Sequence, residues 1–348
     1  MSVMRIAVVR ALHLGDMLCA VPALRALRAG FPDAEITLIG LPWARELIPH
    51  LSRYIDAFEE FPGFPGIPER AYDASSIIAF LGRMQARGFD LAVQLHGSGS
   101  HINEFTALLG ARRTVVFNDG DISGDISGDD SVRWPKHGTE AARLLMLPLA
   151  LGCPDRGLDL DISIDDYDRE IVRAMIADPF DGRECICVHP GARFPSRRWP
   201  AERFAAVADA LAGHGYEIVV TGTSGEAPVT RALCNAMHAP ALDLTGKLTL
   251  GMFAALVSEC AMVICNDTGI SHVAAATSTP SVVVASGSDV ARWKPEDESL
   301  HRVLWHDVPC RPCMHITCPT AHECATGVGV SDALRAAIDL LASRPSHV

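Results

Sequence analysis

A short polar turn between an apolar segment and a run of small residues carries the clearest chemical signal in this sequence. The turn reads Asn266-Asp267-Thr268-Gly269; residues 261–264 before it are apolar, and His272 and several alanines follow it. This order predicts a buried strand of a parallel sheet, a tight turn and a helix. The first N–H groups of a helix are unpaired and its dipole is positive there, which favours bound phosphate. We therefore expect this turn and His272 to contact a phosphorylated ligand.

An arginine-rich loop forms the second signal. Gly191 and Ala192 follow the predicted strand at 185–188, and the loop then places its arginines at Arg193, Arg197 and Arg198. Glycine lets the backbone approach a diphosphate closely, and a guanidinium offers paired N–H donors to phosphate oxygens. We expect this loop to form a basic rim in which Arg197 or Arg198 stabilises a diphosphate. The alternative is a solvated loop in which Trp199 only anchors the next helix.

Two acidic residues follow other predicted strands, and each has two interpretations. Glu226 ends the segment Gly222-Thr223-Ser224-Gly225-Glu226. It either accepts hydrogen bonds from ribose hydroxyls or is a first-turn glutamate favoured by the helix dipole. Asp16 follows Gly15 after the first predicted strand. It is either a helix N-cap or a general base at the sheet edge, and the spacing favours neither.

A hydroxyl-rich segment follows the predicted strand at 90–95. It reads His96-Gly97-Ser98-Gly99-Ser100 and lacks the lysine and the length of a P-loop. We expect His96 and Ser98 to line the pocket for a second substrate.

Charge and composition narrow the class of protein. The 348-residue chain has 30 Lys and Arg against 42 Asp and Glu, a net charge of −12, and 49% hydrophobic residues. Because the acidic excess is spread along the chain, we expect no nucleic-acid partner. No apolar run reaches the roughly 20 residues of a membrane-spanning helix. The first residues lead into a predicted strand without a signal-peptide pattern, so we expect a cytoplasmic protein; peripheral contact with the inner membrane stays open.

The cysteines form one notable cluster. Four of the eleven lie near the end of the chain, at Cys310, Cys313, Cys318 and Cys324, with two histidines interleaved. This spacing is compatible with a structural zinc ion, although the second C-x2-C pair of a typical site is missing. The alternative is a proline-rich loop with free thiols. We expect no metal in catalysis.

A second unusual segment is rich in aspartate. It spans residues 118–130 and suggests calcium at first sight. Because it lacks the terminal glutamate of an EF-hand and is too short for a calcium-binding roll, we expect a mobile surface loop.

Strands and helices alternate in both halves of the chain. Strands are predicted at 5–9, 35–39, 90–95, 185–188, 217–220 and 281–284. This βαβ order predicts doubly wound parallel sheets, and the length suits two domains. We expect an α/β protein with two Rossmann-like domains, 1–168 and 169–348. A ligand should lie where their carboxyl edges face one another across a cleft.

In combination, these segments resemble the ADP-heptose:lipopolysaccharide heptosyltransferase family, glycosyltransferase family 9. The matching elements occur in family order over nearly the whole chain. They are Leu14-Gly15-Asp16-Met17-Leu18 with Pro22-Ala23-Leu24, Val188-His189-Pro190-Gly191-Ala192, Arg198-Trp199-Pro200, Gly222-x3-Glu226, Asp243-Leu244-Thr245-Gly246 with Leu250, Asn266-Asp267-Thr268-Gly269 with His272, and Arg292-Trp293-x-Pro295. The closing cysteine cluster also looks like one found in many members. The chain departs from the pattern at 191–192, where some members carry threonines.

The resemblance implies a GT-B fold with an acceptor-binding first domain, a nucleotide-sugar-binding second domain and a last helix, near 331–343, that packs back on the first domain. It implies an inverting, metal-independent transfer of heptose from ADP-heptose to a lipopolysaccharide core or a related glycan. Asp16 matches the base that deprotonates the acceptor hydroxyl, and Arg197 or Arg198 matches the residue that neutralises the leaving diphosphate. The implied donor contacts are Gly191, Ala192, Arg193, Gly222, Glu226, Asp267, Thr268, Gly269 and His272, and the acceptor-side residues are Gly15, His96 and Ser98.

Three other functions fit the same residues. One is a GT-B transferase that uses another nucleotide sugar or acceptor. Another is a sugar-nucleotide epimerase. The third is a nucleotide-sugar-binding protein that has lost catalysis.

Overall fold

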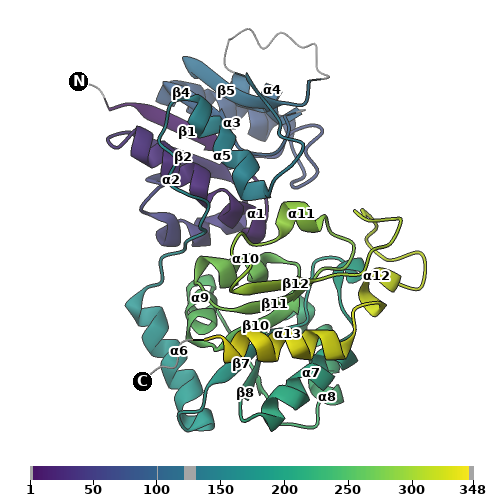
Figure 1. Ribbon diagram of the computed structural model, residues 1–348. Coiled ribbons are helices and arrows are strands. Elements are labelled where there is room, and N and C mark those ends of the chain that lie inside the picture. Colours follow the sequence, from purple (N-terminus) through teal and green to yellow (C-terminus); the bar gives the residue numbers. More distant parts are fainter. Residues whose placement is uncertain (1–2, 100, 121–130, 345–348) are drawn as a thin grey trace. The chain divides into compact units, whose positions relative to one another are not determined.

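The computed structural model describes residues 3–99, 101–120 and 131–344. Most of the aspartate-rich segment, residues 121–130, and Ser100 lie outside the described residues. The chain divides into two compact units, Met1–Asp159 and Leu160–Val348. The division after Asp159 precedes α6 (Asp166–Phe180), which contains the boundary expected at 168/169. Each unit is a Rossmann-type α/β layer structure, and two such units in tandem are the GT-B architecture (Figure 1).

The N-terminal unit is built on one parallel sheet. Among the described residues its strands are β1 (Arg5–Val9), β2 (Glu35–Gly40), β3 (Ala57–Glu60), β4 (Leu91–Gln94), β5 (Arg113–Asn118) and β6 (Ser131–Arg133). They lie in the order β3-β2-β1-β4-β5-β6. The central pairings align Val8 with Leu38 on one side and with Val93 on the other. The central strands β1, β2 and β4 are mostly apolar and buried because both faces of the sheet are covered there.

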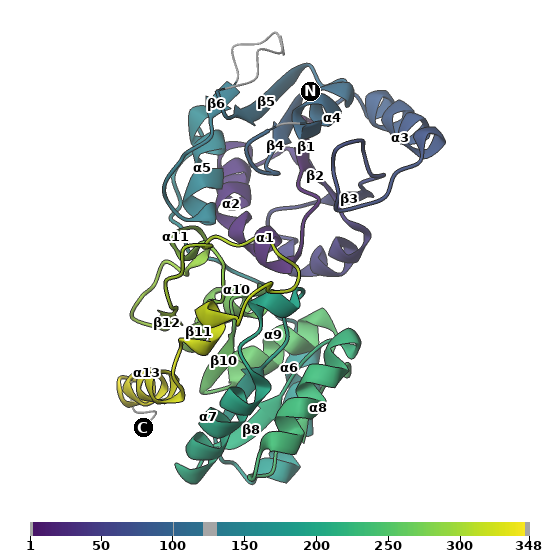
Figure 2. The same ribbon diagram turned by 90° about the vertical axis from the view of Figure 1, so that its right-hand side faces the viewer.

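Helices cover both faces of this sheet. They are α1 (Leu14–Cys19), α2 (Val21–Gly30), α3 (Ala74–Arg87), α4 (His101–Leu108) and α5 (Glu140–Ala150), with short 3-10 turns at η1 (Pro42–Leu47) and η2 (Pro49–Leu51). Helices α1, α2 and α5 contact one another, and α3 and α4 lie on the opposite side of the strands (Figure 2). On that side Phe61, Phe80 and Phe105 pack as a buried aromatic group against the sheet. Helix α3 begins at Asp73, whose carboxylate accepts from the Ser76 N–H, and ends at Gly88 in the left-handed conformation.

The C-terminal unit repeats the same plan. Its described strands are β7 (Cys185–His189), β8 (Glu217–Val220), β9 (Leu242–Asp243), β10 (Met262–Asn266), β11 (Ser281–Val284) and β12 (His301–Leu304). Their order is β12-β11-β10-β7-β8-β9, again fully parallel. The predicted strands at 5–9, 217–220 and 281–284 are confirmed with the same bounds.

The helices of this unit also form two layers. They are α6 (Asp166–Phe180), α7 (Ala201–Gly213), α8 (Ala227–Ala236), α9 (Leu250–Glu259), α10 (Gly269–Ala276), α11 (Val290–Trp293), α12 (Glu323–Thr326) and α13 (Val330–Ala342), with 3-10 turns at η3 (Pro195–Arg197) and η4 (Ser224–Glu226). Helices α7, α8 and α13 cover one face, and α6, α9 and α10 cover the other (Figure 1). Trp199 and Phe204 are fully buried at the centre of the first layer.

The last helix, α13, contacts α7, β11 and β12 of its own unit. The expectation from the family resemblance that it packs back on the first domain stays a prediction. Its buried residues Ala333, Ala337 and Leu340 belong to the core of that unit. The small alanines let the helix approach α7 closely, so the buried apolar face of α13 is used within the C-terminal unit.

In each sheet the order in which the strands follow one another along the chain reverses at one place. The strand order changes between β1 and β4 in the first unit and between β7 and β10 in the second. At such a point the connections leave in opposite directions and open a crevice at the carboxyl ends of the strands, where ligands of this fold class bind. Over the described part of the chain, none of the helices is both long and apolar enough to cross a bilayer.

Candidate active site

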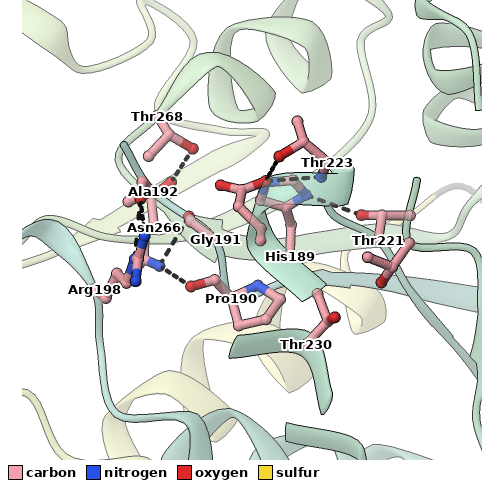
Figure 3. Close-up of polar contacts among 12 residues, drawn as sticks. His189, Pro190, Gly191, Ala192, Arg198, Thr221, Thr223, Thr230, Asn266 and Thr268 are labelled. Carbon is pink, nitrogen blue, oxygen red and sulfur yellow. Dashed lines mark hydrogen bonds and ion pairs between the residues drawn. The ribbon is translucent and has the colours of Figure 1, made fainter. Parts of the chain in front are cut away.

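The buried side-chain amide of Asn266 holds the loop after β7 at the strand-order reversal of the C-terminal unit. Asn266, the last residue of β10, is fully buried. Its Nδ2 donates to the carbonyl oxygens of Pro190 (2.8 Å) and Gly191 (3.2 Å), and its Oδ1 accepts from the Trp199 N–H (2.8 Å). Figure 3 shows Asn266 between the loop residues it binds. Asn266 thus fastens both ends of the arginine loop to β10, the strand that precedes the turn at 266–269. Its position in the sequence did not predict this role.

Arg198 is turned toward the backbone of its own loop. Its Nε and Nη2 both donate to the carbonyl oxygen of Ala192, at 2.9 and 2.8 Å (Figure 3). This forked contact closes the loop between the end of β7 and η3. Arg198 therefore holds Ala192 in place.

Arg197 is half-buried and binds two other loops. Its Nη1 donates to the Ser286 carbonyl at 3.4 Å, and its Nη2 donates to the Cys313 carbonyl. Burial lowers the pKa of Arg197, and the negative charge of Asp267 opposes that shift. The guanidinium therefore lies within electrostatic range of the turn after β10. The third arginine of the rim, Arg193, is exposed and lies over the ring of Phe194.

Glu226 makes the capping contact of one interpretation, and the contact with ribose hydroxyls stays a prediction. One carboxylate oxygen, Oε2, accepts from the Thr223 N–H (2.8 Å) and hydroxyl (2.9 Å), which is a capping contact. The other, Oε1, lies against Gly191, where an added Cβ would approach it to 2.2 Å. Glu226 is thus a cap of its own turn and also a wall of the crevice beside the end of β7. Gly222 allows this packing, since a Cβ there would meet the Thr230 methyl at 2.8 Å.

His189 lies beneath this wall and was missed as a site residue. Its Nδ1 is 3.0 Å from the Thr221 hydroxyl, and its Nε2 is 3.8 Å from Glu226 Oε2 (Figure 3). Burial lowers the pKa of His189, while the Glu226 charge opposes the shift. A polar residue at the last position of an apolar strand, Cys185–His189, was the available sequence signal.

The turn after β10 meets the N-terminus of α10, as predicted. Thr268 is the N-cap, Gly269 is the first helical residue, and the side chains of Asp267 and Thr268 are half-buried. Burial raises the pKa of the Asp267 carboxyl, and the charges of His272 and Arg197 oppose the rise. His272 is buried, with its ring edge-on to Trp293. The turn therefore presents backbone N–H groups, a hydroxyl and a carboxylate at one sheet edge.

The N-terminal unit places its candidates at its own reversal point. Asp16 lies in the first turn of α1, and its Oδ2 accepts from the His13 N–H at 3.3 Å. The carboxylate is half-buried, whereas Gly15 beside it is buried. The prediction of Asp16 as the helix N-cap is therefore wrong, because His13 is the N-cap and Asp16 is the third helical residue, whose carboxylate accepts from the His13 N–H in a capping box. The role of Asp16 as a general base stays a prediction.

His96 follows β4 at the neighbouring strand end. Its Nδ1 accepts from the Ala11 N–H at 3.1 Å, which leaves the proton of the neutral ring on Nε2. Burial and the charge of Arg10 lower the pKa of His96 to about 3. His96 is therefore a neutral donor at physiological pH. Ser98, two residues further along, is half-buried.

A buried ion pair in this unit was missed altogether. Arg10 and Glu140 are 0% and 1% exposed, with 3.4 Å between Nη2 and Oε1. The available sequence signal was a charged residue, Arg10, directly after the apolar strand that ends at Val9.

The cysteine cluster does not form a recognisable metal site in the described residues. No three His, Cys, Asp or Glu side chains there are arranged to hold a metal ion. Cys310 is exposed and Cys324 is buried, and both thiols are free. The backbone of this segment instead supports the arginine loop, because the Ser196 N–H donates to the Ile316 carbonyl at 3.1 Å. Structural zinc stays a prediction, which elemental analysis of the purified protein can check.

The family model for glycosyltransferase family 9 (heptosyltransferase) matches residues 133–323, more than half of the chain. The chain belongs to glycosyltransferase family 9. The match includes the arginine loop, Glu226 and the turn after β10, and this membership makes the protein a glycosyltransferase.

Individual relatives agree with this membership. Lipopolysaccharide heptosyltransferase 3 of Escherichia coli is 27% identical over 302 residues, covering 82% of this chain and 84% of that protein. The crystal structure of a family 9 glycosyltransferase from Veillonella parvula DSM 2008 superposes with a TM-score of 0.84 at 23% identity, covering 99% of both chains. The E. coli ADP-heptose LPS heptosyltransferase II gives a TM-score of 0.77 at 20% identity, covering 97% of this chain and 99% of that one. At these identities the structures support the GT-B fold of this family 9 member.

Proposed function

We propose that this family 9 glycosyltransferase transfers heptose from ADP-heptose to a lipopolysaccharide core or a related glycan, with inversion and without a metal ion. The observation that carries the proposal is the convergence of Gly191, Glu226 and the turn at 266–269 on the crevice between β7 and β10. The names of the relatives supply the heptose, and the name of the E. coli structural relative supplies ADP-heptose.

The donor would be held by the C-terminal unit. The N-terminus of α10 and the N–H groups of the turn at 266–269 suit a diphosphate, which carries negative charge. Arg197 and Arg198 keep cationic charge beside it as the bond to the sugar breaks. Glu226 is the candidate partner of the ribose hydroxyls, because its Oε1 faces Gly191 at the rim of the crevice.

The acceptor would be activated by the N-terminal unit. In a single displacement the acceptor hydroxyl attacks the anomeric carbon, the carbon–oxygen bond to the diphosphate breaks, and ADP departs with the bonding electrons. The acceptor proton moves to the carboxylate of Asp16, which acts as the general base. One such step inverts the anomeric configuration. His96, a neutral donor, and Ser98 would orient the acceptor.

Transfer should be measured with ADP-heptose and a heptose-accepting core oligosaccharide, with NMR assignment of the anomeric configuration of product and donor. Inverted product, unchanged by EDTA, supports the proposal. Retention of configuration would exclude the single displacement. Calorimetric titration with ADP, UDP and GDP tests the donor, and a clear preference for UDP would exclude ADP-heptose.

The role of Asp16 has its own test. Asp16→Asn keeps the shape of the side chain and removes the base, so we expect kcat to fall by about 10²–10⁴-fold while ADP binding persists. Unchanged kcat would exclude Asp16 as the base.

A further inference from the structure

We propose that Arg10 is a positioning residue that fixes Asp16 for proton abstraction, a role that rests on the function proposed above. Arg10 lies directly after β1, and its side chain is fully buried. Its guanidinium joins three elements that the chain otherwise connects only through loops. They are α1, the end of β4 and the start of α5.

The three contacts converge on one guanidinium. Nε donates to the carbonyl oxygen of Asp16 at 2.7 Å. Nη1 donates to the carbonyl oxygen of Leu95, and Nη2 lies 3.4 Å from Glu140 Oε1. The acceptors thus include the backbone of the candidate base itself and the residue next to His96.

The contact to Asp16 matters because α1 is short. The helix has six residues, and the N–H of its C-cap Ala20 donates to Leu18 and Met17 rather than to Asp16. A helix of this length has few internal hydrogen bonds to fix its orientation. The bond from Arg10 therefore ties the Asp16 backbone to the sheet edge, and the direction of the Asp16 carboxylate follows from that of its backbone.

Arginine suits this place better than lysine. A planar guanidinium has five N–H donors in fixed directions, whereas an ammonium on a flexible stem cannot reach three separated acceptors with the same geometry. Glu140 supplies the balancing charge, and at the first residue of α5 its carboxylate also interacts with the positive end of the helix dipole. A buried pair of this kind contributes little net stability relative to apolar packing, which leaves positional order as the gain from keeping it.

Arg28 provides a matched comparison within the same unit. It donates to the carbonyl oxygens of Pro32 (3.3 Å), Ala34 (2.7 Å) and Tyr54 (3.2 Å) and pairs with Asp56. Like Arg10, it therefore binds several backbone carbonyls and one carboxylate. Arg28 makes these contacts before β2 and β3, at the amino edge of the sheet, whereas Arg10 makes its contacts at the carboxyl edge.

The test is a double-mutant cycle on kcat with Arg10→Lys and Asp16→Asn. We expect Arg10→Lys to lower kcat about 10–100-fold with KM for ADP-heptose within about twofold, because the proposed donor residues belong to the other unit. If Arg10 acts through Asp16, the double variant should be no more than about threefold slower than Asp16→Asn alone. Multiplication of the two effects would overturn the proposal. Arg28→Lys should leave kcat within about twofold, and an equal loss there would also overturn it.

A second variant covers failure of Arg10→Lys to fold. Glu140→Gln keeps an oxygen acceptor for Nη2 and removes the charge, so we expect a folded protein with kcat about 3–10-fold lower. Unchanged kcat in Glu140→Gln would contradict the positioning role. Wild-type kcat in Asp16→Asn would instead contradict the base assignment, so failure of the proposed function is separable from failure of this inference.

Discussion

The carboxylate of Glu226 packs against the α-carbon of Gly191. A Cβ at position 191 would lie 2.2 Å from Oε1 and 2.4 Å from Cδ of Glu226, closer than real Cβ contacts come. The same carboxylate is held from the other side by the Thr223 N–H and hydroxyl. Gly191 is therefore required by a side chain 35 positions away in sequence, and the contact joins the loops after β7 and β8 into one wall of the crevice.

Gly191→Ala should weaken nucleotide binding while leaving the fold intact. The added methyl displaces the end of a flexible side chain rather than backbone, so we expect stability to change by less than about 1 kcal/mol. Displacement of the Glu226 carboxylate should weaken ADP binding about tenfold, or about 1.4 kcal/mol. Calorimetric titration with ADP measures the affinity, and thermal unfolding measures the stability.

Gly213→Ala is the matched control for this change. Gly213 is the last residue of α7 in the same unit, and a Cβ there meets no atom within 4 Å. We expect unchanged ADP affinity and equal or slightly higher stability, because alanine favours the helix. Equal affinities of Gly191→Ala and the wild type would show that the Glu226 carboxylate does not contribute to the nucleotide site.

Asn266→Ala should destabilise the C-terminal unit. The substitution removes donors from the carbonyls of Pro190 and Gly191 and an acceptor from the Trp199 N–H in a fully buried place. Unsatisfied buried groups cost about 1–3 kcal/mol each, so a loss of about 2–4 kcal/mol is expected after relaxation. Urea unfolding measures it. Asn266→Asp keeps the acceptor but faces two carbonyls with a carboxylate oxygen, so it should also be less stable than the wild type. Unchanged stability of both variants would show that the hydrogen bonds of Asn266 do not hold the loop.

The sequence predicted those parts of the fold that depend on local pattern. Apolar runs ending in turns gave the strands Arg5–Val9 and Ser281–Val284 at their observed bounds. The reversal points also followed, because βαβ order and right-handed crossovers leave few topologies for each unit. The turn at 266–269 lies where an Asn-Asp-Thr-Gly segment after a buried strand is expected.

What the sequence could not predict are side-chain directions set by distant partners. Arg197 or Arg198 was expected to stabilise a diphosphate, and the sequence did not predict that two N–H groups of Arg198 bind the Ala192 carbonyl. Whether a guanidinium faces ligand or backbone depends on where a loop closes, and no periodicity encodes that. The Arg10–Glu140 pair joins positions 130 apart, so neither residue signals the other. The contacts of α13 with α7, β11 and β12 were not predicted for the same reason, since an amphipathic face does not specify what covers it.

His96 should make stability depend on pH. Its folded pKa is about 3, below the ordinary value of 6.5, so the unfolded chain binds a proton first as the pH falls. The contribution is complete above pH 6.5 and is lost progressively toward pH 3. At pH 5 the loss is about 2 kcal/mol relative to pH 7.5. His96→Asn, whose Oδ1 can accept from the Ala11 N–H, should reduce this loss in urea unfolding; an unchanged pH dependence would contradict the burial of a neutral ring.

Cys318 should be the most nucleophilic thiol of the cysteine cluster. The contact between the Thr320 hydroxyl and Cys318 Sγ, 3.5 Å apart, and a hydrogen bond from the Thr320 backbone lower the pKa of Cys318, so its thiolate forms at lower pH than that of an ordinary cysteine. Iodoacetamide labelling followed by mass spectrometry as a function of pH gives the midpoint for each thiol. Thr320→Val keeps the side-chain shape and removes the hydroxyl, and we expect it to move the Cys318 midpoint upward.

The fully buried Cys187 and Cys265 serve as internal controls that label only on unfolding. If zinc holds the cluster in the purified protein, Cys318 will be protected until a chelator is added; a Cys318 midpoint that Thr320→Val does not shift would exclude the hydroxyl as the cause.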